Sequence, residues 1–193
     1  MRVIAGEAHG QRLKAPRGLA TRPATARVRE SIFSRLAVRL DFAGIRVLDV
    51  FAGSGSLGIE ALSRGAEHAT FIDSSRAAAS AIAANLARLG LRLRARVMMQ
   101  EVRSALRELG AERARFDLVF VDAPYRNDMS AEVLRLLAEM GLIARGGWIV
   151  VGQSRRAPEP PAACGEFDRP MVARLGDHRI AFYRREETAP GES

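Results

Sequence analysis

Strands and helices alternate along most of this chain, and that alternation constrains the fold more than any other feature. Short apolar runs are each followed by a segment with helical periodicity. The five predicted strands cover Ile45–Val50, Ala69–Asp73, Leu93–Met99, Phe116–Val121 and Trp148–Val151. The predicted helices between them cover Leu57–Arg64, Arg76–Leu89, Val102–Leu109 and Met129–Met140. Continuously apolar strands joined by amphipathic helices indicate an α/β protein with a mostly parallel sheet covered on both faces.

The regions outside this alternation predict a further helix and two hairpins. Val3–Ala15 predicts two short extended segments around Gly6–Gly10, and a basic, proline-marked link follows. Apolar residues spaced by four predict a helix over Thr25–Leu40. Phe167–Leu175 and His178–Arg184 predict a hairpin at the sheet edge, which brings the sheet to seven strands. We therefore expect a hairpin and link at 1–24, a sheet domain at 25–185 and a disordered tail at 186–193.

The charge of the chain favours a polyanionic partner. Lys and Arg number 30 against 22 Asp and Glu, a net charge of +8, and Lys14 is the only lysine. A GC-rich genome explains the choice of Arg over Lys, but it does not explain the excess of positive charge. The single cysteine excludes a disulfide within the chain, and no Cys/His cluster has the spacing of a metal site. Without an apolar run long enough for a membrane span or a signal peptide, we expect a cytoplasmic protein that does not bind a membrane.

The first strand runs into a glycine-rich loop, Asp49–Gly58, before the next helix. Glycines let backbone N–H groups approach a ligand closely. The loop matches G-x-G-x-x-G and Asp73 ends the next strand, so a nicotinamide dinucleotide is one candidate ligand. Asp49 favours S-adenosylmethionine (SAM), because a carboxylate there repels pyrophosphate but attracts the ammonium group of SAM. The predicted contacts are Asp49, Phe51, Ala52, Gly53, Ser54, Gly55 and Asp73.

Glu101 and Val102 follow the third strand and are candidates for binding adenine. The Glu101 carboxylate can accept a hydrogen bond from the adenine amino group, and the Val102 N–H can donate to a ring nitrogen. Equally, Glu101 can stabilise the N-terminus of the helix that begins there, through the helix dipole.

The fourth strand opens into Asp122-Ala123-Pro124-Tyr125, which has the composition of a catalytic loop for transfer to an exocyclic amino group. Functional groups gather at the carboxyl ends of parallel strands, so this loop should face the glycine loop. The Asp122 carboxylate and the Ala123 carbonyl can hold an amino group in line and stabilise its developing positive charge. Tyr125 offers a ring on which an extruded base can stack. The alternative is an ordinary turn, which Asp and Pro both favour.

These motifs resemble the class I SAM methyltransferases that act on amino groups, whose usual loop is Asp or Asn, Pro, Pro, then Tyr or Phe. Over about Met1–Arg185 the chain resembles the RsmD family of bacterial 16S ribosomal RNA guanine-N2 methyltransferases. The segments that carry the resemblance are Arg2–Gly6, Arg22-Pro23, Arg27–Glu30, Phe51–Gly55 and Glu60–Arg64. The resemblance implies a Rossmann-like domain with a small N-terminal hairpin. It also implies methylation of guanine N2 in small-subunit RNA, within an assembled or assembling 30S particle, with S-adenosylhomocysteine (SAH) as product.

Three positions depart from the family pattern. Ala123 stands where a first proline is usual, which keeps the backbone carbonyl but makes the loop less rigid, at a cost of about 0.4–1 kcal/mol. Ala24 stands where threonine is usual, and Gly152-Gln153 stands near a position that is often Glu. We expect activity to survive all three changes.

The basic residues ahead of the sheet domain are candidates for RNA binding. A block of this kind can hold the RNA backbone and set where the target base enters. The candidates are His9, Arg12, Arg22, Arg27 and Arg29. For any single arginine a solvated helix face is the simpler interpretation, and Arg29 with Glu30 is also placed to brace the catalytic loop. The rival functions are an adenine-N6 methyltransferase, a nicotinamide-dependent oxidoreductase and a non-catalytic SAM-binding ribosome-assembly factor.

Overall fold

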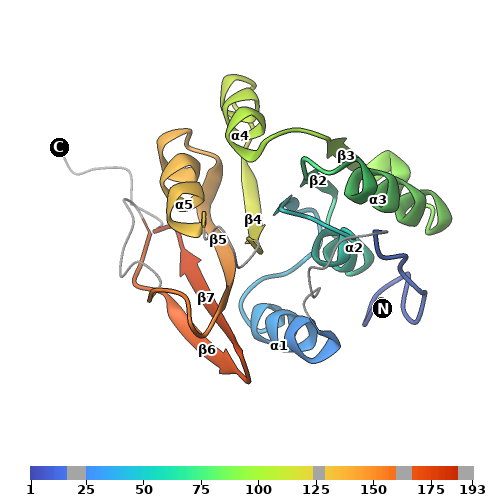
Figure 1. The fold of residues 1–193 in the computed structure, drawn as a ribbon, viewed down its shortest axis with the longest axis horizontal. Coiled ribbons are helices and arrows are strands. Elements are labelled where there is room, and N and C mark those ends of the chain that lie inside the picture. Colours follow the sequence, from blue (N-terminus) through green and yellow to red (C-terminus); the bar gives the residue numbers. More distant parts are fainter. Residues whose placement is uncertain (17–24, 124–128, 160–166, 187–193) are drawn as a thin grey trace.

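Seven strands form a single sheet in the order β3-β2-β1-β4-β5-β7-β6 (Figure 1). The computed structural model describes residues 1–16, 25–123, 129–159 and 167–186. Strands β1 to β5 are parallel, whereas β7 is antiparallel to both of its neighbours. The strands are β1 (Arg46–Val50), β2 (His68–Ile72), β3 (Ala95–Met98), β4 (Phe116–Val121), β5 (Ile143–Ser154), β6 (Met171–Leu175) and β7 (His178–Arg184). The predicted α/β, Rossmann-like fold class is confirmed.

Helices cover both faces of the sheet because the central strands bury side chains on both sides. In β1, Val47 packs into one core and Leu48 into the other. Helices α1, α2 and α3 pack into the first core, and α4 and α5 into the second. The helices are α1 (Ala26–Ala37), α2 (Ser56–Ser63), α3 (Arg76–Arg88), α4 (Val102–Ala111) and α5 (Ser130–Glu139). None of the helices in the described ranges is long and apolar enough to cross a membrane.

The strand register brings three aspartates to one edge of the sheet. Asp49 pairs with Phe71 on β2 and with Phe120 on β4. Asp73 and Asp122 each lie two residues beyond these partners. Because side chains alternate between the faces of a sheet, all three carboxylates lie on the face that α1 to α3 cover. They stand at the carboxyl ends of their strands, where ligands bind in open α/β sheets.

The N-terminal segment forms a small hairpin that packs into the sheet domain. Arg2 and Arg12 form an antiparallel bridge, and the Val3 N–H donates to the Gln11 carbonyl at 2.9 Å. Val3 and Leu13 are buried in the same core as α1 to α3. In Figure 1 the hairpin, near the end marked N, lies beside α2 and α3. The boundary that we drew at residue 24 therefore does not separate two hydrophobic cores, although residues 17–24 lie outside the described ranges.

Three predicted strands differ by two residues or more from the bounds in the structure. The third is shorter, because Arg92–Arg94 form a 3-10 turn before β3 begins at Ala95. The fifth is longer, because Ile143 pairs with Phe116 and the register then shifts before Leu118. The predicted edge hairpin is present as β6 and β7, but β6 begins at Met171, and Phe167 forms only an isolated bridge with Arg185. Of the predicted tail, residues 187–193 lie outside the described ranges.

Candidate active site

Two aspartates fix the glycine loop through its backbone. Asp49 is 1% exposed, and its Oδ2 accepts a hydrogen bond from the Gly58 N–H at 2.9 Å. The carboxylate of Asp73 accepts from the Gly53 N–H and from the Ser75 N–H, both at 2.9 Å. The loop is therefore bonded to Asp49 on β1 through Gly58, and to Asp73 after β2 through Gly53. Each Asp73 oxygen keeps a lone pair that a ligand hydroxyl can use.

The electrostatics of this edge favour a positively charged ligand. Burial raises the pKa of Asp49 to about 8, although the hydrogen bond from Gly58 lowers it, and the negative charges of Asp122 and Asp73 raise it further. Desolvation raises the pKa of Asp122 to about 6. Among the described residues no ion pair involves Asp49, Asp73 or Asp122. A cation bound among these carboxylates would restore their ordinary ionisation.

The backbone of the loop leaves room for a ligand at one glycine and for packing at another. A Cβ at Gly53 would meet no atom closer than 3.9 Å, so the space there is open. A Cβ at Gly58 would lie 2.4 Å from the ring of Phe71, so this glycine allows α2 to pack on β2. Phe51 adopts a φ of +60°, which is strained for a residue with a side chain. The close packing at Gly58 occurs in dinucleotide loops too, so it does not discriminate between SAM and a nicotinamide ligand.

A small, mostly apolar pocket that is partly open to solvent lies beside Asp122. Residues of α1, α2, β4, β5 and β7 line it together with Asp122, among them Val28, Ile32, Leu57, Gly152 and Ile180. The side chain of Asp122 is closely packed against β5, because a Cβ at Gly152 would lie 2.7 Å from its Oδ1. This pocket therefore joins a hydrogen-bond acceptor to apolar walls, which suits a flat heterocycle that carries an amino group.

Comparison with known proteins shows the family. A family model described as "Conserved hypothetical protein 95" matches residues 1–184. The chain belongs to this family. The Ribosomal RNA small subunit methyltransferase D of Escherichia coli (strain K12) is 38% identical over 195 residues, which cover 100% of this chain and 93% of the relative. The resemblance to the RsmD family that we drew from the sequence is confirmed.

Solved structures agree with this membership. The structure of the Escherichia coli protein yhhF has a TM-score of 0.83 and 35% sequence identity, and the match covers 96% of this chain and 98% of that one. A more distant structure, SMU.776 complexed with SAH, has a TM-score of 0.60 and 13% identity, and covers 77% of this chain and 48% of that one. At that identity the second likeness shows the fold alone.

Three further predicted residues of this family member, Glu101, Val102 and Ala123, follow the carboxyl ends of β3 and β4. Glu101 is exposed and precedes α4, and its side chain makes no capping hydrogen bond there. Val102 is buried at the first position of α4, where backbone N–H groups have no acceptor within the helix. Ala123 is buried next to Asp122. Pro124 and Tyr125 lie outside the described residues.

The predicted RNA-binding residues divide into exposed and buried ones. His9 and Arg12 on the hairpin and Arg27 on α1 are exposed, as a contact with RNA requires. Arg29 is 1% exposed, and its Nη2 donates to the Arg2 carbonyl at 2.7 Å. Its burial lowers the pKa of the guanidinium, although the nearby negative charge of Glu60 raises it. We therefore correct the role of Arg29 from surface RNA contact to brace between α1 and the hairpin. Arg22 lies outside the described residues.

Sequence reasoning missed three polar side chains that dock the hairpin: Glu60, Ser63 and Asn85. Glu60 is fully buried and accepts hydrogen bonds from the Ile4 and Ala5 N–H groups at 2.7 and 3.0 Å. Asn85 is also fully buried. The available signal was a charged residue within the apolar run Leu57–Leu62, because a buried charge requires partners.

Proposed function

We propose that this protein transfers a methyl group from SAM to the exocyclic N2 of a guanine in 16S ribosomal RNA of the small subunit. The observation that carries the proposal is the convergence of Asp49, Asp73 and Asp122 beside a glycine loop, with Asp122 also lining an apolar pocket. The family relationship supports the same activity, since the Escherichia coli relative is named for methylation of small-subunit ribosomal RNA.

The residues present fit SAM. SAM carries a sulfonium and an ammonium group, and this edge holds carboxylates that no described cation neutralises. Asp49 would attract the ammonium group, and the free lone pairs of Asp73 would accept hydrogen bonds from the ribose hydroxyls. The open space at Gly53 lets the loop backbone approach the ligand. SAH bound to SMU.776, a protein of the same fold, is consistent with this assignment.

Asp122 and Ala123 would orient the acceptor. SAM supplies an already activated methyl group, so the residues need to position a weakly nucleophilic amino nitrogen. The ionised Asp122 carboxylate would accept one N–H of that amino group, and the Ala123 carbonyl the other. Both acceptors stabilise the positive charge that develops on nitrogen, and the proton is lost after transfer. The apolar walls at Val28 and Ile32 would hold the base and exclude water.

The exposed basic residues His9, Arg12 and Arg27 would hold the RNA backbone near this pocket. We place the reaction in the cytoplasm, on an assembled or assembling 30S particle, because the implied substrate is found there.

The proposal is tested with labelled SAM and small ribosomal subunits that lack this methylation, followed by mass spectrometry of the nucleosides. We expect N2-methylguanosine in the 16S RNA. The matched control is D122N, which keeps the shape of the side chain but removes the carboxylate charge. We expect this variant to bind SAM and to lose at least about 100-fold in kcat.

Other products would contradict the proposal in distinguishable ways. N6-methyladenine would keep the chemistry and overturn the guanine target. SAM binding without any transfer to subunits or free RNA would favour a non-catalytic assembly factor. Binding of a nicotinamide cofactor in place of SAM would overturn the assignment of the glycine loop.

A further inference from the structure

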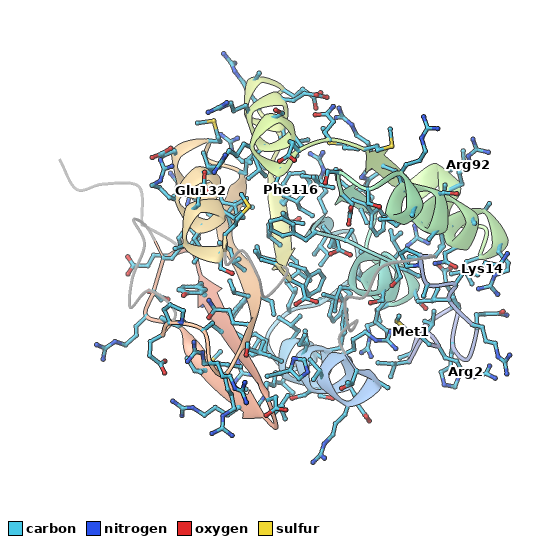
Figure 2. The ribbon with its side chains drawn as sticks, in the orientation of Figure 1. Met1, Arg2, Lys14, Arg92, Phe116 and Glu132 are labelled. Atoms are coloured by element: carbon cyan, nitrogen blue, oxygen red, sulfur yellow. The ribbon has the colours of Figure 1, made fainter. Side chains whose placement is uncertain are left out.

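The hairpin is held to the sheet domain mainly through its main chain, together with one ion pair between Glu7 and Arg94 at 2.6 Å. The Ala8 N–H donates to Ser63 Oγ at 3.0 Å, and the Glu7 N–H donates to the Ser63 carbonyl at 2.8 Å. Gly6 has a φ of +82°, and a Cβ there would lie 1.7 Å from the Ser63 carbonyl oxygen, so the two backbones are in direct contact. The side chains of Arg2, His9, Arg12 and Lys14 are left exposed, and Figure 2 shows Arg2 and Lys14 at the outer edge of the molecule.

Asn85 joins the end of this hairpin to the glycine loop. Its Oδ1 accepts from the Lys14 N–H at 2.8 Å, and its Nδ2 donates to the Lys14 carbonyl at 3.0 Å. The same Nδ2 also donates to the Ser54 carbonyl at 3.1 Å. One fully buried side-chain amide on α3 therefore bonds to the main chain of the hairpin at Lys14 and to the main chain of the glycine loop at Ser54.

The Ser54 carbonyl has a particular need for this bond. Ser54 precedes the N-cap of α2, Gly55, whose carbonyl accepts the first helical bond from the Ile59 N–H at 2.9 Å, so the Ser54 carbonyl has no partner within the helix. The Gly58 N–H, in the first turn of the helix, donates to Asp49. Among the described residues, Asn85 donates to the Ser54 carbonyl. Ser54 stands between Gly53 and Gly55, both at positive φ, where the glycine backbone has wide conformational freedom.

We propose that Asn85 is a positioning residue, which sets the glycine loop for SAM by bonding it to the N-terminal hairpin. This inference rests on the proposed binding of SAM by the loop. The hairpin then acts as part of the cofactor site although its charged side chains face away from it. RNA held by those side chains is bound to an element that is in fixed register with the loop and so with the methyl donor.

The test compares N85L with S63A and with the wild type. N85L keeps the approximate size of the side chain but removes all three hydrogen bonds. S63A removes two hydrogen bonds to the hairpin, from Ala8 and to the Ala5 carbonyl, without removing one to the loop. We expect N85L to raise the Kd for SAM, measured by calorimetry without RNA, by about ten-fold or more, with kcat at saturating SAM little changed. We expect S63A to leave the Kd within about two-fold of the wild type even where it lowers Tm.

A structural role alone would lower Tm in both variants and leave the Kd unchanged in both, which would overturn the inference. An equal rise in Kd in both variants would overturn it as well. Hydrogen exchange on the wild type supplies a test that does not depend on the folding of a variant. SAM should slow exchange of the Lys14 N–H, whose acceptor is Asn85, and an unchanged rate would contradict the proposal. If the wild type binds no SAM in the same calorimeter, the proposed function fails rather than the role of Asn85.

Discussion

Replacing Asp49 with Asn should stabilise the ligand-free protein while weakening its binding of SAM. Asp49 is almost completely buried beside two other carboxylates, and its pKa rises from 3.8 to about 8. D49N keeps an oxygen that can accept from the Gly58 N–H, so the loop should retain this bond. The variant removes the Asp49 carboxyl group, whose ionisation in the folded state is unfavourable because it is buried.

The size of the effect follows from the shift in pKa. Below about pH 4 the carboxyl is protonated in both the folded and the unfolded chain, so it contributes no difference. Between about pH 4 and pH 8 the unfolded chain releases the proton and the folded protein retains it, so stability falls as pH rises. At pH 7 this cost is about 4 kcal/mol as an upper limit, against about 2 kcal/mol at pH 5. Half of the larger amount would raise Tm by about 4–8 °C in a chain of this length.

The assay is thermal unfolding of the wild type and D49N at pH 5, 7 and 8.5, with and without SAM. We expect the advantage of D49N to grow with pH when SAM is absent. We expect it to shrink or reverse when SAM is present, because the wild type then gains binding energy that D49N lacks. The matched control is D168N, which changes an exposed aspartate and should leave Tm within about 1–2 °C. A D49N protein that is less stable than the wild type at pH 8.5, or that binds SAM equally well, would refute the reasoning.

Three further predictions follow from the same site. G152A places a Cβ 2.7 Å from Asp122 Oδ1, so the carboxylate should turn aside. We therefore expect kcat to fall by about 10–100-fold with little change in the free energy of unfolding. An unchanged kcat would contradict this. G58A places a Cβ 2.4 Å from the fully buried Phe71 ring, so urea unfolding should show a loss of about 1–3 kcal/mol, and a neutral effect would mean that α2 can shift freely. Acceptor binding needs an ionised Asp122, whose pKa is about 6, so kcat/KM should fall as the pH drops through about 6. A kcat/KM that stays constant from pH 5 to 8 would argue against this role of Asp122.

The sequence predicted the elements whose signals are local. Apolar runs located the strands, and the placement of Asp49, Asp73 and Asp122 at the ends of parallel strands followed from the general geometry of such sheets. The ends of β5 were not predictable in this way. Ile143–Gly147 contains two adjacent glycines, which indicate a break, yet β5 continues through them because Ile143 pairs with Phe116 before a shift in register and Trp148 pairs with Leu118 after it.

The hairpin docking could not be predicted because its partners are distant main-chain groups. Glu60 accepts from Ile4, 56 residues away, and Asn85 accepts from Lys14, 71 residues away. Nothing in the type of residue at position 4 or 14 indicates that its N–H is the donor. The burial of Arg29 was hidden for a related reason. An arginine on a basic helix is usually solvated, and only the packing of the hairpin against α1 and α2 shows that this one lies beside Glu60.

The main chain and the side chains of the N-terminal hairpin have different roles. Buried side chains of the sheet domain bind the hairpin main chain. Except at Gly6, these bonds do not depend on which side chains the hairpin carries. Arg2 bonds to the Gly10 carbonyl and Glu7 pairs with Arg94, whereas the exposed side chains of His9 and Arg12 make no hydrogen bond or ion pair with another described residue and can serve a polyanionic partner. Substitutions at His9 or Arg12 should therefore change RNA affinity and its dependence on salt while leaving Tm and SAM binding nearly constant. Substitutions at Glu60 should change stability, and substitutions at Asn85 should change both stability and SAM binding, without altering the salt dependence. A hairpin variant such as R12Q that lowered Tm as much as N85L would contradict this division.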